Sequence, residues 1–476
     1  MATVITSIGS KGTTGNPVNG ALTMISGVSG SGSPWTGTVK FSTSPTANVG
    51  DMVYFHQVYY NCGGMGGGCS GPADIIYLIT AVSSTTLTIK YISGGANSAP
   101  MDLKANSMGS SNAQPYVLRY YSTIAGWDAE LDETALYSSG DTAQGEMYKD
   151  SDFQMSSDVT INGGGTVGLD TRTLTAAVGQ RHDGTADSGV RVLCTSTGGD
   201  SEVIEMDGSV GSAGGTGNQI QFLEVDCNEK KIRAGIRLHY YGGAQNCLVH
   251  GARWTGSYNE TVGIKSYSKN TWVCNCIVYD IYENNGSSNG WGTRGIRIQQ
   301  NDWEACVNNT VYGTKTNSSA GLTFAYGIEV KNGGSYQRVY NNIAMETSSD
   351  NGTATDFVTQ TSTSYTDANY SSDTSAPGDT NYRSESAADT FVSTSTGSED
   401  FHLKDGSNAL RVGKDAGANE TVQGRRMPYS PYDWDVDIDG RDRDSEADDW
   451  DIGADQCDTC SEGSSGNPAL LLFFDT

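Results

Sequence analysis

Short stretches of alternating apolar and polar residues recur along the middle of the chain and align with one another. They read AQNCLVHG at 244–251, VCNCIVYD at 273–280, CVNNTVYG at 306–313 and VYNNIAME at 339–346. One column of the alignment is asparagine throughout: Asn246, Asn275, Asn308 and Asn341. The next column holds Cys247, Cys276, Asn309 and Asn342, and a third holds Val249, Val278, Val311 and Ala344. Runs of this length, bounded by turn residues, predict short strands.

A second motif, Gly-Ile, lies between these stretches. Its copies are AGIRLHY, VGIKSYS, RGIRIQQ and YGIEVKN. The two motifs together repeat about every 28–33 residues, and a β-rich repeat of that length predicts a solenoid. We expect stacked rungs about 4.8 Å apart, with the asparagine amides hydrogen-bonded along the axis. The isoleucines expected to point inward are Ile236, Ile264, Ile296 and Ile328.

The repeat spacing, the asparagine column and the Gly-Ile strand resemble a right-handed parallel β-helix of the pectate-lyase type over residues 156–346. Three later phrases are DANYSSDTSAPGD, DFHLKDGSNALRVGKDAG and DVDIDGRDRDSEADDWDIGADQ. They resemble the closing coils of uncharacterised bacterial and phage β-helix proteins, which implies a solenoid that continues to about residue 456. The resemblance implies an architecture and no particular activity.

The predicted fold class is therefore all-β, a right-handed parallel β-helix with a small N-terminal β-barrel or sandwich module. Five parts are expected along the chain. They are an extended arm at 1–36, the β module at 37–95, a polar connection at 96–155, the β-helix at 156–456, and a linker with an apolar tail at 457–476.

Cysteine placement leaves several interpretations open. Cys247 and Cys276 occupy equivalent places on consecutive rungs, where stacked buried thiols, a rung-to-rung disulfide or half of a metal site would each fit. Two other pairs are better disulfide candidates, because each brackets a loop without a core of its own. These pairs are Cys62 with Cys69 and Cys457 with Cys460.

Charge and composition exclude some partners. The 476 residues carry a formal net charge of −26, so the chain repels phosphate backbones and we expect no nucleic-acid partner. No apolar run approaches the roughly 18 residues of a membrane span. The opening MATVITSIGSKG lacks the basic and apolar regions of a signal peptide. A polar, acidic chain rich in glycine and tyrosine indicates an extracellular or virion-surface protein with no signal peptide and no membrane insertion.

One acidic stretch fits a calcium-binding pattern, and we expect no other cofactor. Its candidate ligands are Asp435, Asp437, Asp439 and Glu446, with Gly440 at the sharp turn. No flanking helix is expected, however. The alternative is an acidic structural turn paired with Arg441 or Arg443.

The residues after the inward isoleucines predict a basic surface stripe: Arg237, Lys265 and Arg297, followed by Glu329. Polysaccharide lyases of the resembled fold use such side chains, so the resemblance implies an anionic glycan as one ligand. The alternative is a solvated strand face with cross-rung pairs such as Arg297–Glu329. Loop aromatics expected to gather on one side, for a sugar or a protein partner, are Trp254, Tyr258, Tyr282 and Trp291.

The last residues form the most apolar run of the chain: Leu470, Leu471, Leu472, Phe473 and Phe474. Five consecutive large apolar residues exposed to water would promote aggregation, so we expect them to be buried against another surface. Because a flexible spacer precedes it, docking on another subunit is favoured over capping of the solenoid. We therefore expect a homo-oligomer or a larger assembly.

These features favour a structural or adhesive surface protein. It would be a subunit of a virion (tail fibre, spike or capsid decoration) or of an extracellular assembly, with a surface polysaccharide as a ligand, and no catalytic residue is assigned. The alternative is a β-helix polysaccharide lyase or glycoside hydrolase that acts on an anionic polysaccharide.

Overall fold

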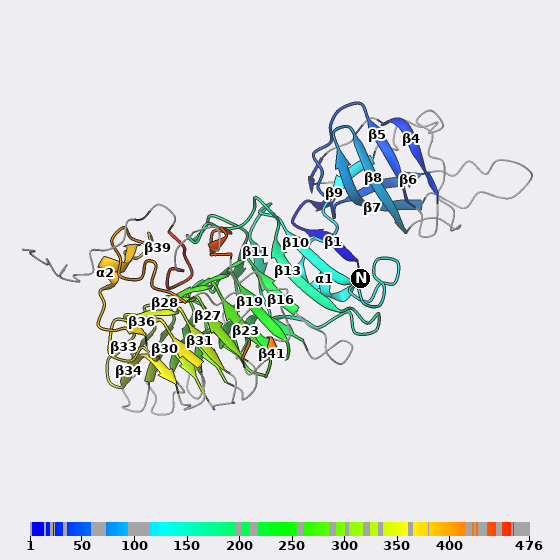
Figure 1. Cartoon of the computed structure of the whole chain (residues 1–476). Coiled ribbons are helices and arrows are strands. Elements are labelled where there is room, and N and C mark those ends of the chain that lie inside the picture. Colours follow the sequence, from blue (N-terminus) through cyan, green and yellow to red (C-terminus); the bar gives the residue numbers. More distant parts are fainter. Residues whose placement is uncertain are drawn as a thin grey trace, which may run out of the picture. The chain divides into compact units, whose positions relative to one another are not determined.

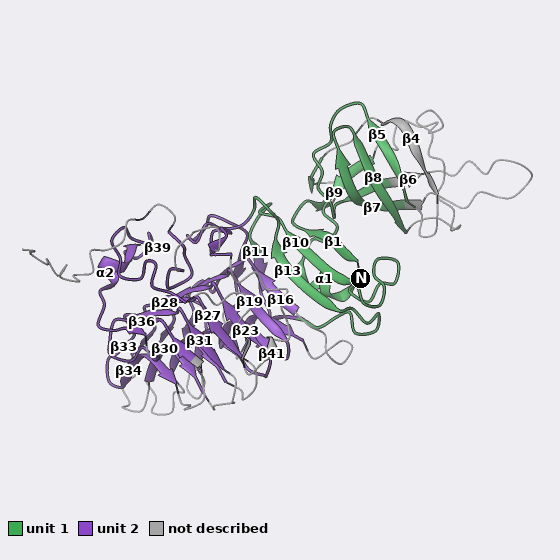
Figure 2. Cartoon of the chain, in the orientation of Figure 1, with its two compact units in different colours: residues 1–153, 161–180, 210–215 green, residues 154–160, 181–209, 216–476 purple. Residues whose placement is uncertain are grey.

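The computed structural model describes most of the chain. The described residues are 2–13, 16–19, 22, 24–31, 36–58, 73–93, 115–196, 201–208, 218–254, 260–284, 292–299, 304–317, 324–331, 337–359, 365–378, 380–414, 421–422, 425–426, 436–443, 450–457 and 460. They divide into two compact units (Figures 1 and 2). Unit 1 comprises residues 1–153, 161–180 and 210–215, and unit 2 comprises residues 154–160, 181–209 and 216–476.

Unit 1 contains one antiparallel sheet in the order β4-β5-β8-β7-β6-β9. Its strands are β4 (Met24–Ser31), β5 (Thr36–Phe41), β6 (Met52–Val58), β7 (Ala73–Ser83), β8 (Thr86–Ser93) and β9 (Pro115–Leu118). Alternate residues of β5, β6, β7, β8 and β9 form one apolar core that includes Val39, Phe55 and Ile89. The expected barrel or sandwich is thus a single sheet around its core and not a closed barrel among the described residues. The module also includes β4 and β9, which lie outside the predicted 37–95.

Unit 1 also carries parallel strands that the sequence did not suggest. β1 (Thr3–Ile8) pairs in parallel with β10 (Thr142–Met147), which pairs in parallel with β13 (Thr171–Ala176). The predicted arm at 1–36 and connection at 96–155 are therefore wrong in part, because both contribute paired strands. The remaining elements of this region are β2 (Gly12–Thr13), β3 (Asn16–Pro17), α1 (Ile124–Ala129), β11 (Phe153–Met155) and β12 (Val159–Ile161).

Unit 2 contains the parallel β-helix that the sequence predicts (Figure 1). The first sheet holds β16 (Asn218–Gln221), β19 (Gly242–Gln245), β23 (Trp272–Cys274), β27 (Ala305–Val307), β31 (Arg338–Tyr340) and β35 (Tyr365–Asp367). The second sheet holds β14 (Arg191–Cys194), β17 (Glu224–Asp226), β20 (Leu248–His250), β24 (Ile277–Tyr279), β28 (Thr310–Tyr312), β32 (Ile343–Met345), β36 (Asn369–Ser371) and β37 (Asn381–Tyr382). The third sheet holds β15 (Glu202–Asp207), β18 (Ala234–His239), β22 (Thr261–Ser266), β26 (Thr293–Ile298), β30 (Phe324–Val330) and β34 (Thr353–Thr359). A fourth, short sheet holds β21 (Arg253–Trp254), β25 (Tyr282–Glu283), β29 (Lys315–Thr316) and β33 (Ser348–Ser349).

The predicted side-chain columns are confirmed by the strand register. Ile236, Ile264, Ile296 and Ile328 are direct neighbours on successive strands of the third sheet, and all are buried. The Gly-Ile motif follows from this packing. A Cβ atom on Gly263 would lie 2.3 Å from Cγ1 of Val278 and 2.7 Å from the carbonyl oxygen of Gly295, so only glycine fits there.

The asparagines have two roles. The expected column occupies the left-handed region, with φ between 51° and 56°: Asn246, Asn275, Asn308 and Asn341. The more extensive amide ladder lies one residue later and is fully buried. Nδ2 of Asn309 donates to Oδ1 of Asn342 at 3.0 Å, and Nδ2 of Asn342 donates to Oδ1 of Asn369 at 3.1 Å. Cys276 extends this ladder by donating its backbone N–H to Oδ1 of Asn309 at 3.0 Å.

The C-terminal segment, which we define as residues 387–457, folds back along the outside of the solenoid (orange to red in Figure 1). Its elements are α2 (Ala387–Thr390), β38 (Phe391–Ser393), β39 (Asp400–Leu403), β40 (Thr421–Val422) and β41 (Arg425–Arg426). Apolar residues such as Phe401 and Ile452 pack with Leu248, Ile277 and Ile343 of the second sheet. The predicted β-helix at 156–456 is therefore too long, because β38 pairs antiparallel with β39 and this segment covers the rungs instead of adding to them.

Asparagine side chains of the left-handed column hold the C-terminal segment through hydrogen bonds to its backbone. The amides of Asn246 and Asn275 both donate to the carbonyl oxygen of Val436, at 3.1 and 2.7 Å. Farther along the solenoid, Asn341 exchanges side-chain hydrogen bonds with the backbone of Lys414. Among the described residues, no helix is long and apolar enough to cross a membrane.

Replacement of Ile296 by aspartate should place an unpaired charge in the solenoid core. We expect Ile296→Asp to lower the free energy of unfolding by about 4 kcal/mol or more, measured by denaturant titration. The matched control is Val178→Asp, because Val178 is 84% exposed. The control should change stability by no more than about 0.5 kcal/mol. Equal stability of the two variants would show that the strand faces are assigned wrongly.

Candidate functional site

The outer face of the third sheet carries charged residues that are buried. Lys265 and Arg297 are each only 2% exposed, as is Glu329 on the next strand. The expected basic surface stripe is therefore wrong for Lys265 and Arg297. The alternative interpretation is correct in its cross-rung pairing but not in its solvated face, since Nε of Arg297 lies 2.8 Å from Oε2 of Glu329 and both side chains are buried.

Two carboxylates and three cations make up this buried ion cluster: Glu260, Glu329, Lys265, Arg294 and Arg297. Glu260 lies 2.6 Å from Nζ of Lys265 and 3.3 Å from Nη1 of Arg294, and it also pairs with Arg297. Burial alone would raise the pKa of the Glu260 carboxyl, but the three cations outweigh it and hold the pKa below its ordinary value. Burial lowers the pKa of Lys265. These charges stabilise one another and are not presented to a substrate.

Exposed aromatic rings lie at the end of the same sheet. Tyr240 and Tyr267 are 40% and 38% exposed, the highest values for aromatic side chains among the described residues. The ring of His239 lies 6.4 Å from the Tyr240 ring and 5.2 Å from the Tyr267 ring. The guanidinium of Arg237, also partly exposed, lies 4.8 Å from the centre of the Tyr267 ring. We call these four residues the aromatic patch.

The aromatic patch is held in place by carboxylates beneath it. Nε2 of His239 lies 3.0 Å from Oε1 of Glu205, and Nη1 of Arg237 donates to Glu202 at 3.0 Å. The hydrogen bond from His239, with the charge of Arg237, holds the pKa of Glu205 below its ordinary value despite its burial. These ion pairs fix Arg237 and His239, while Tyr240 and Tyr267 keep 40% and 38% of their surface exposed to solvent.

Of the four expected loop aromatics, the two that the structure describes do not form such a surface. Trp254 is 1% exposed and packs against the ammonium of Lys231, while Tyr282 is half-buried beneath Arg253. Tyr258 and Trp291 lie outside the described residues. The aromatic patch replaces these loops as the candidate binding surface, with Arg237 as the one residue of the expected stripe that remains accessible.

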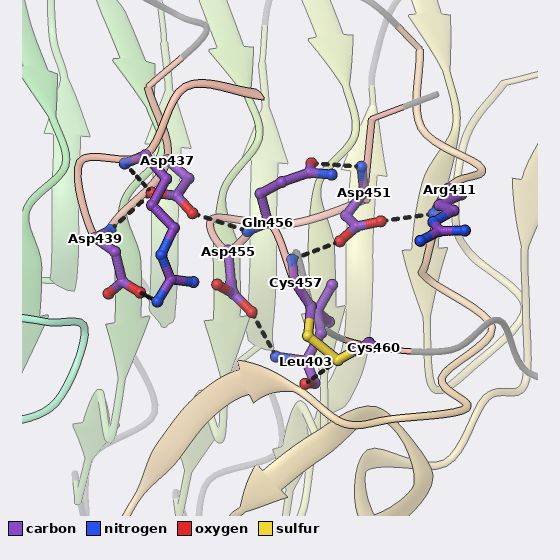
Figure 3. The surroundings of a disulfide bond; sticks show 10 residues. Leu403, Arg411, Asp437, Asp439, Asp451, Asp455, Gln456, Cys457 and Cys460 are labelled. Carbon is purple, nitrogen blue, oxygen red and sulfur yellow. Dashed lines mark hydrogen bonds and ion pairs between the residues drawn. A yellow bond between two sulfur atoms is a disulfide. The ribbon is translucent and has the colours of Figure 1, made fainter. Parts of the chain in front are cut away.

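The described part of the expected calcium loop forms a hydrogen-bonded turn (Figure 3). Oδ1 of Asp437 accepts hydrogen bonds from the backbone N–H groups of Asp439 and Arg441, and its Oδ2 accepts one from the backbone N–H of Gln456. Calcium binding by the predicted set stays a prediction. Asp435 and Glu446 lie outside the described residues. Arg441 pairs with Asp439 at 3.2 Å, as the alternative interpretation requires.

Arg443 explains why this turn is fixed. Its guanidinium is buried and donates to the carbonyl oxygens of Gly453 and Ala454 at 2.9 and 2.8 Å. Burial lowers the pKa of Arg443, while the neighbouring aspartates favour its charged form. The Arg443 side chain thus connects the turn that contains DVDIDG to the backbone of the DIGADQ stretch.

The cysteines of the solenoid are free, buried thiols: Cys194, Cys227, Cys247, Cys274, Cys276 and Cys306. Burial and the neighbouring Cys247 raise the pKa of Cys276 well above its ordinary value, so it is held as the thiol. The stacked-thiol interpretation is therefore correct for Cys247 and Cys276. Cys457 and Cys460 form a disulfide with Cα atoms 5.5 Å apart. Cys62 and Cys69 lie outside the described residues, as does the tail from Leu470 to Phe474.

Two histidine–carboxylate clusters were missed by the sequence analysis. In the first, Nε2 of His250 lies 3.0 Å from Oε1 of Glu224 and Nδ1 lies 3.8 Å from Oδ1 of Asp226. His250 is the register neighbour of Asp226, so the repeat alignment contains the signal one column beyond Val249. The second cluster joins His402, Asp439 and Asp455. Its members come from separate stretches of the C-terminal segment, whose proximity the solenoid period does not predict.

Comparison with known proteins identifies no family for this chain. No protein-family model and no curated protein matches the chain. Three solved structures show weak likeness to it. The tailspike protein gp49 of Pseudomonas phage LKA1 is 13% identical with a TM-score of 0.15, over 78% of this chain and 66% of that chain. The tailspike gp61 of Pseudomonas phage phi297 is 12% identical with a TM-score of 0.14, over 74% and 57%. The gp54 tailspike of Acinetobacter baumannii bacteriophage AP22, solved in complex with A. baumannii capsular saccharide, is 9% identical with a TM-score of 0.14, over 73% and 64%. The chain spans less than two thirds of the length of each, and likeness at this level carries no argument about function.

Removal of one carboxylate from the buried ion cluster tests whether the cluster supports the fold. Glu260→Gln would leave three buried cations facing one carboxylate, and we expect the free energy of unfolding to fall by about 3–5 kcal/mol. The matched control is Asp350→Asn, which removes a carboxylate from the pair with Lys315, where both side chains are more than 40% exposed. That change should cost less than about 1 kcal/mol. A Glu260→Gln protein as stable as the control would contradict this account of the cluster.

Proposed function

We propose that this protein is a structural and adhesive subunit of a surface assembly, and that it binds a surface polysaccharide through the aromatic patch. The observation that carries the proposal is the exposed pair Tyr240 and Tyr267, each with its ring near that of His239, on a β-helix whose buried outward charges are paired internally. Exposed tyrosine faces stack on sugar rings, and the nearby Arg237 and His239 supply polar groups for hydroxyls or carboxylates.

The solenoid suits a load-bearing role. Successive rungs share parallel backbone pairing, the asparagine ladder and the ion cluster, so neighbouring rungs are tied at several places around the coil. The C-terminal segment adds an apolar cover along one flank. A surface built on such a scaffold is held rigidly, which reduces the ordering cost of binding.

Location and assembly are part of the same proposal. A virion surface, such as a tail fibre, spike or capsid decoration, or an extracellular assembly would use a rigid acidic solenoid of this kind. The apolar residues Leu470–Phe474 would dock on another subunit and make a homo-oligomer or a larger assembly. The formal net charge of −26 supports the absence of a nucleic-acid partner.

Hydrolysis of a polysaccharide is the second candidate, and one observation favours it. Carboxylate oxygens of Glu224 and Asp226 lie within 4.8 Å of each other and of a ring nitrogen of His250. A glycosidase needs two neighbouring carboxylates of this kind. Against it, Glu224 is fully buried, and its oxygens interact with His250 and with the backbone N–H of Asp187.

A binding assay on a panel of immobilised bacterial surface polysaccharides tests the proposal. We expect the protein to bind at least one of them, and Tyr240→Ala and Tyr267→Ala each to weaken that binding about tenfold, since each removes one stacking face. The matched control is Tyr116→Ala, a partly exposed tyrosine of the N-terminal sheet, which should bind like the unaltered protein. Loss of binding in the control alone, or unchanged binding in both patch variants, would contradict the assignment of the patch.

The same polysaccharides would be examined for new reducing ends and for the absorbance of unsaturated products. We expect neither. Product formation that disappears in Asp226→Asn would instead establish the glycosidase, and the aromatic patch would then be at most an accessory surface.

A further inference from the structure

Separate stretches of the C-terminal segment meet at one open pocket of about 520 Å³. Its walls include His402 from β39, Asp439 from the 436–441 turn and Asp455 from the loop that follows Trp450. Each lies on a different stretch of chain, yet a ring nitrogen of His402 and one oxygen from each carboxylate lie within 4.8 Å of one another. These side chains converge on one point from three directions, and no other part of the account above uses His402 or Asp455.

His402 is oriented toward that point. Its Nδ1 lies 2.5 Å from Oδ1 of Asp400, and its Nε2 is directed to Asp439 at 3.2 Å. A carboxylate on one ring nitrogen fixes the ring and presents the other nitrogen, which is how metal-binding histidines are held. The backbone at Gly184 also comes close to this ring, because a Cβ atom there would lie 3.2 Å from Nε2 of His402. Gly184 also has φ +83°, so two constraints favour glycine there.

Asp455 supplies an independent observation. Its side chain is 2% exposed, and Oδ2 accepts a hydrogen bond from the backbone N–H of Leu403 at 2.7 Å (Figure 3). The other oxygen, Oδ1, is buried at the pocket and accepts no hydrogen bond from the described residues. A buried carboxylate oxygen without a partner is costly, so it indicates a missing ligand that is positively charged.

We propose that His402, Asp439 and Asp455 bind a divalent first-row transition metal ion, with Nε2 of His402 and one carboxylate oxygen from each aspartate as its protein ligands. Imidazole nitrogen suits Zn²⁺ and its neighbours, whereas Ca²⁺ takes oxygen ligands. This site shares only Asp439 with the calcium set expected from the sequence, and it requires no helix around the loop.

The ion would join β39, the 436–441 turn and the 451–457 loop, all of which lie in the segment that covers the solenoid.

Calorimetric titration of the full-length, chelator-treated protein tests the site. Zn²⁺, Mn²⁺ and Ca²⁺ would be added separately and without reductant, because the Cys457–Cys460 disulfide lines the same pocket. We expect Zn²⁺ or Mn²⁺ to saturate at one ion per chain, and Ca²⁺ to bind at least about 100-fold more weakly. The visible bands of bound Co²⁺ give a second readout of the same site. Preference for Ca²⁺, or no saturable binding of either transition metal, would overturn the proposal.

Four variants separate metal binding from a plain ion pair. His402→Gln and Asp455→Asn each remove a ligand and should abolish the one-to-one site. The amide oxygen that Asp455→Asn introduces can still accept the hydrogen bond from the backbone N–H of Leu403, which favours folding of that variant. Asp400→Asn leaves all three ligands and should weaken binding about 10–100-fold, because it releases the imidazole.

Asp405→Asn is the matched control, because Asp405 is an exposed acidic residue of the same pocket wall. This change should alter the affinity for the metal less than about twofold, since it removes no ligand and no support of the imidazole. Circular dichroism would verify that each variant is folded. Equal affinities across the folded variants would refute the assignment.

Discussion

In-register stacking of the rungs is the constraint on which the rest of the structure depends. Each strand of the third sheet pairs with the next at equivalent residues, so isoleucine lies over isoleucine and charge lies over charge. The strand has a period of two, so a slip of one residue would bring Arg297 into the core and Ile296 out of it. The close approach at Gly263 and the buried ladder of Asn309, Asn342 and Asn369 allow only one register.

The register also determines which side chains lie on the outer faces of the sheets. In the second sheet both faces are apolar over much of their length, because Leu248 and Ile277 point away from the inward valines. Strands that are apolar on both faces are typical of sheets covered on both sides, and here the C-terminal segment supplies the second cover. In the third sheet the outward positions hold the ion cluster. The aromatic patch lies at the end of that sheet, where Tyr240 and Tyr267 emerge past the last charged pairs.

The sequence was sufficient to predict the structural features that repeat from rung to rung. The columns of Asn246, Val249 and Ile236 are read directly from the spacing, and the structure places them as neighbours. It was insufficient to predict features that depend on contacts between residues far apart in the sequence. Nothing in the period indicates that β1 pairs with β10, or that Val436 lies over Asn246, 190 residues away. The stripe of Arg237, Lys265 and Arg297 was located correctly on one face, but its burial depends on Glu260 and Arg294, which lie outside that column. The convergence of His402 with Asp455 required the fold-back of the C-terminal segment.

Hydrogen exchange of backbone amides tests the stacked solenoid most directly. The peptides 273–279, 306–312 and 339–345 contain the amides of Cys276, Asn309 and Asn342, each of which donates to an asparagine oxygen on the following rung. If the rungs form one cooperative stack, the protected amides of these peptides exchange together and only through global unfolding, with the same response to denaturant. Independent exchange of the three peptides within minutes under native conditions would contradict the stacked, in-register solenoid.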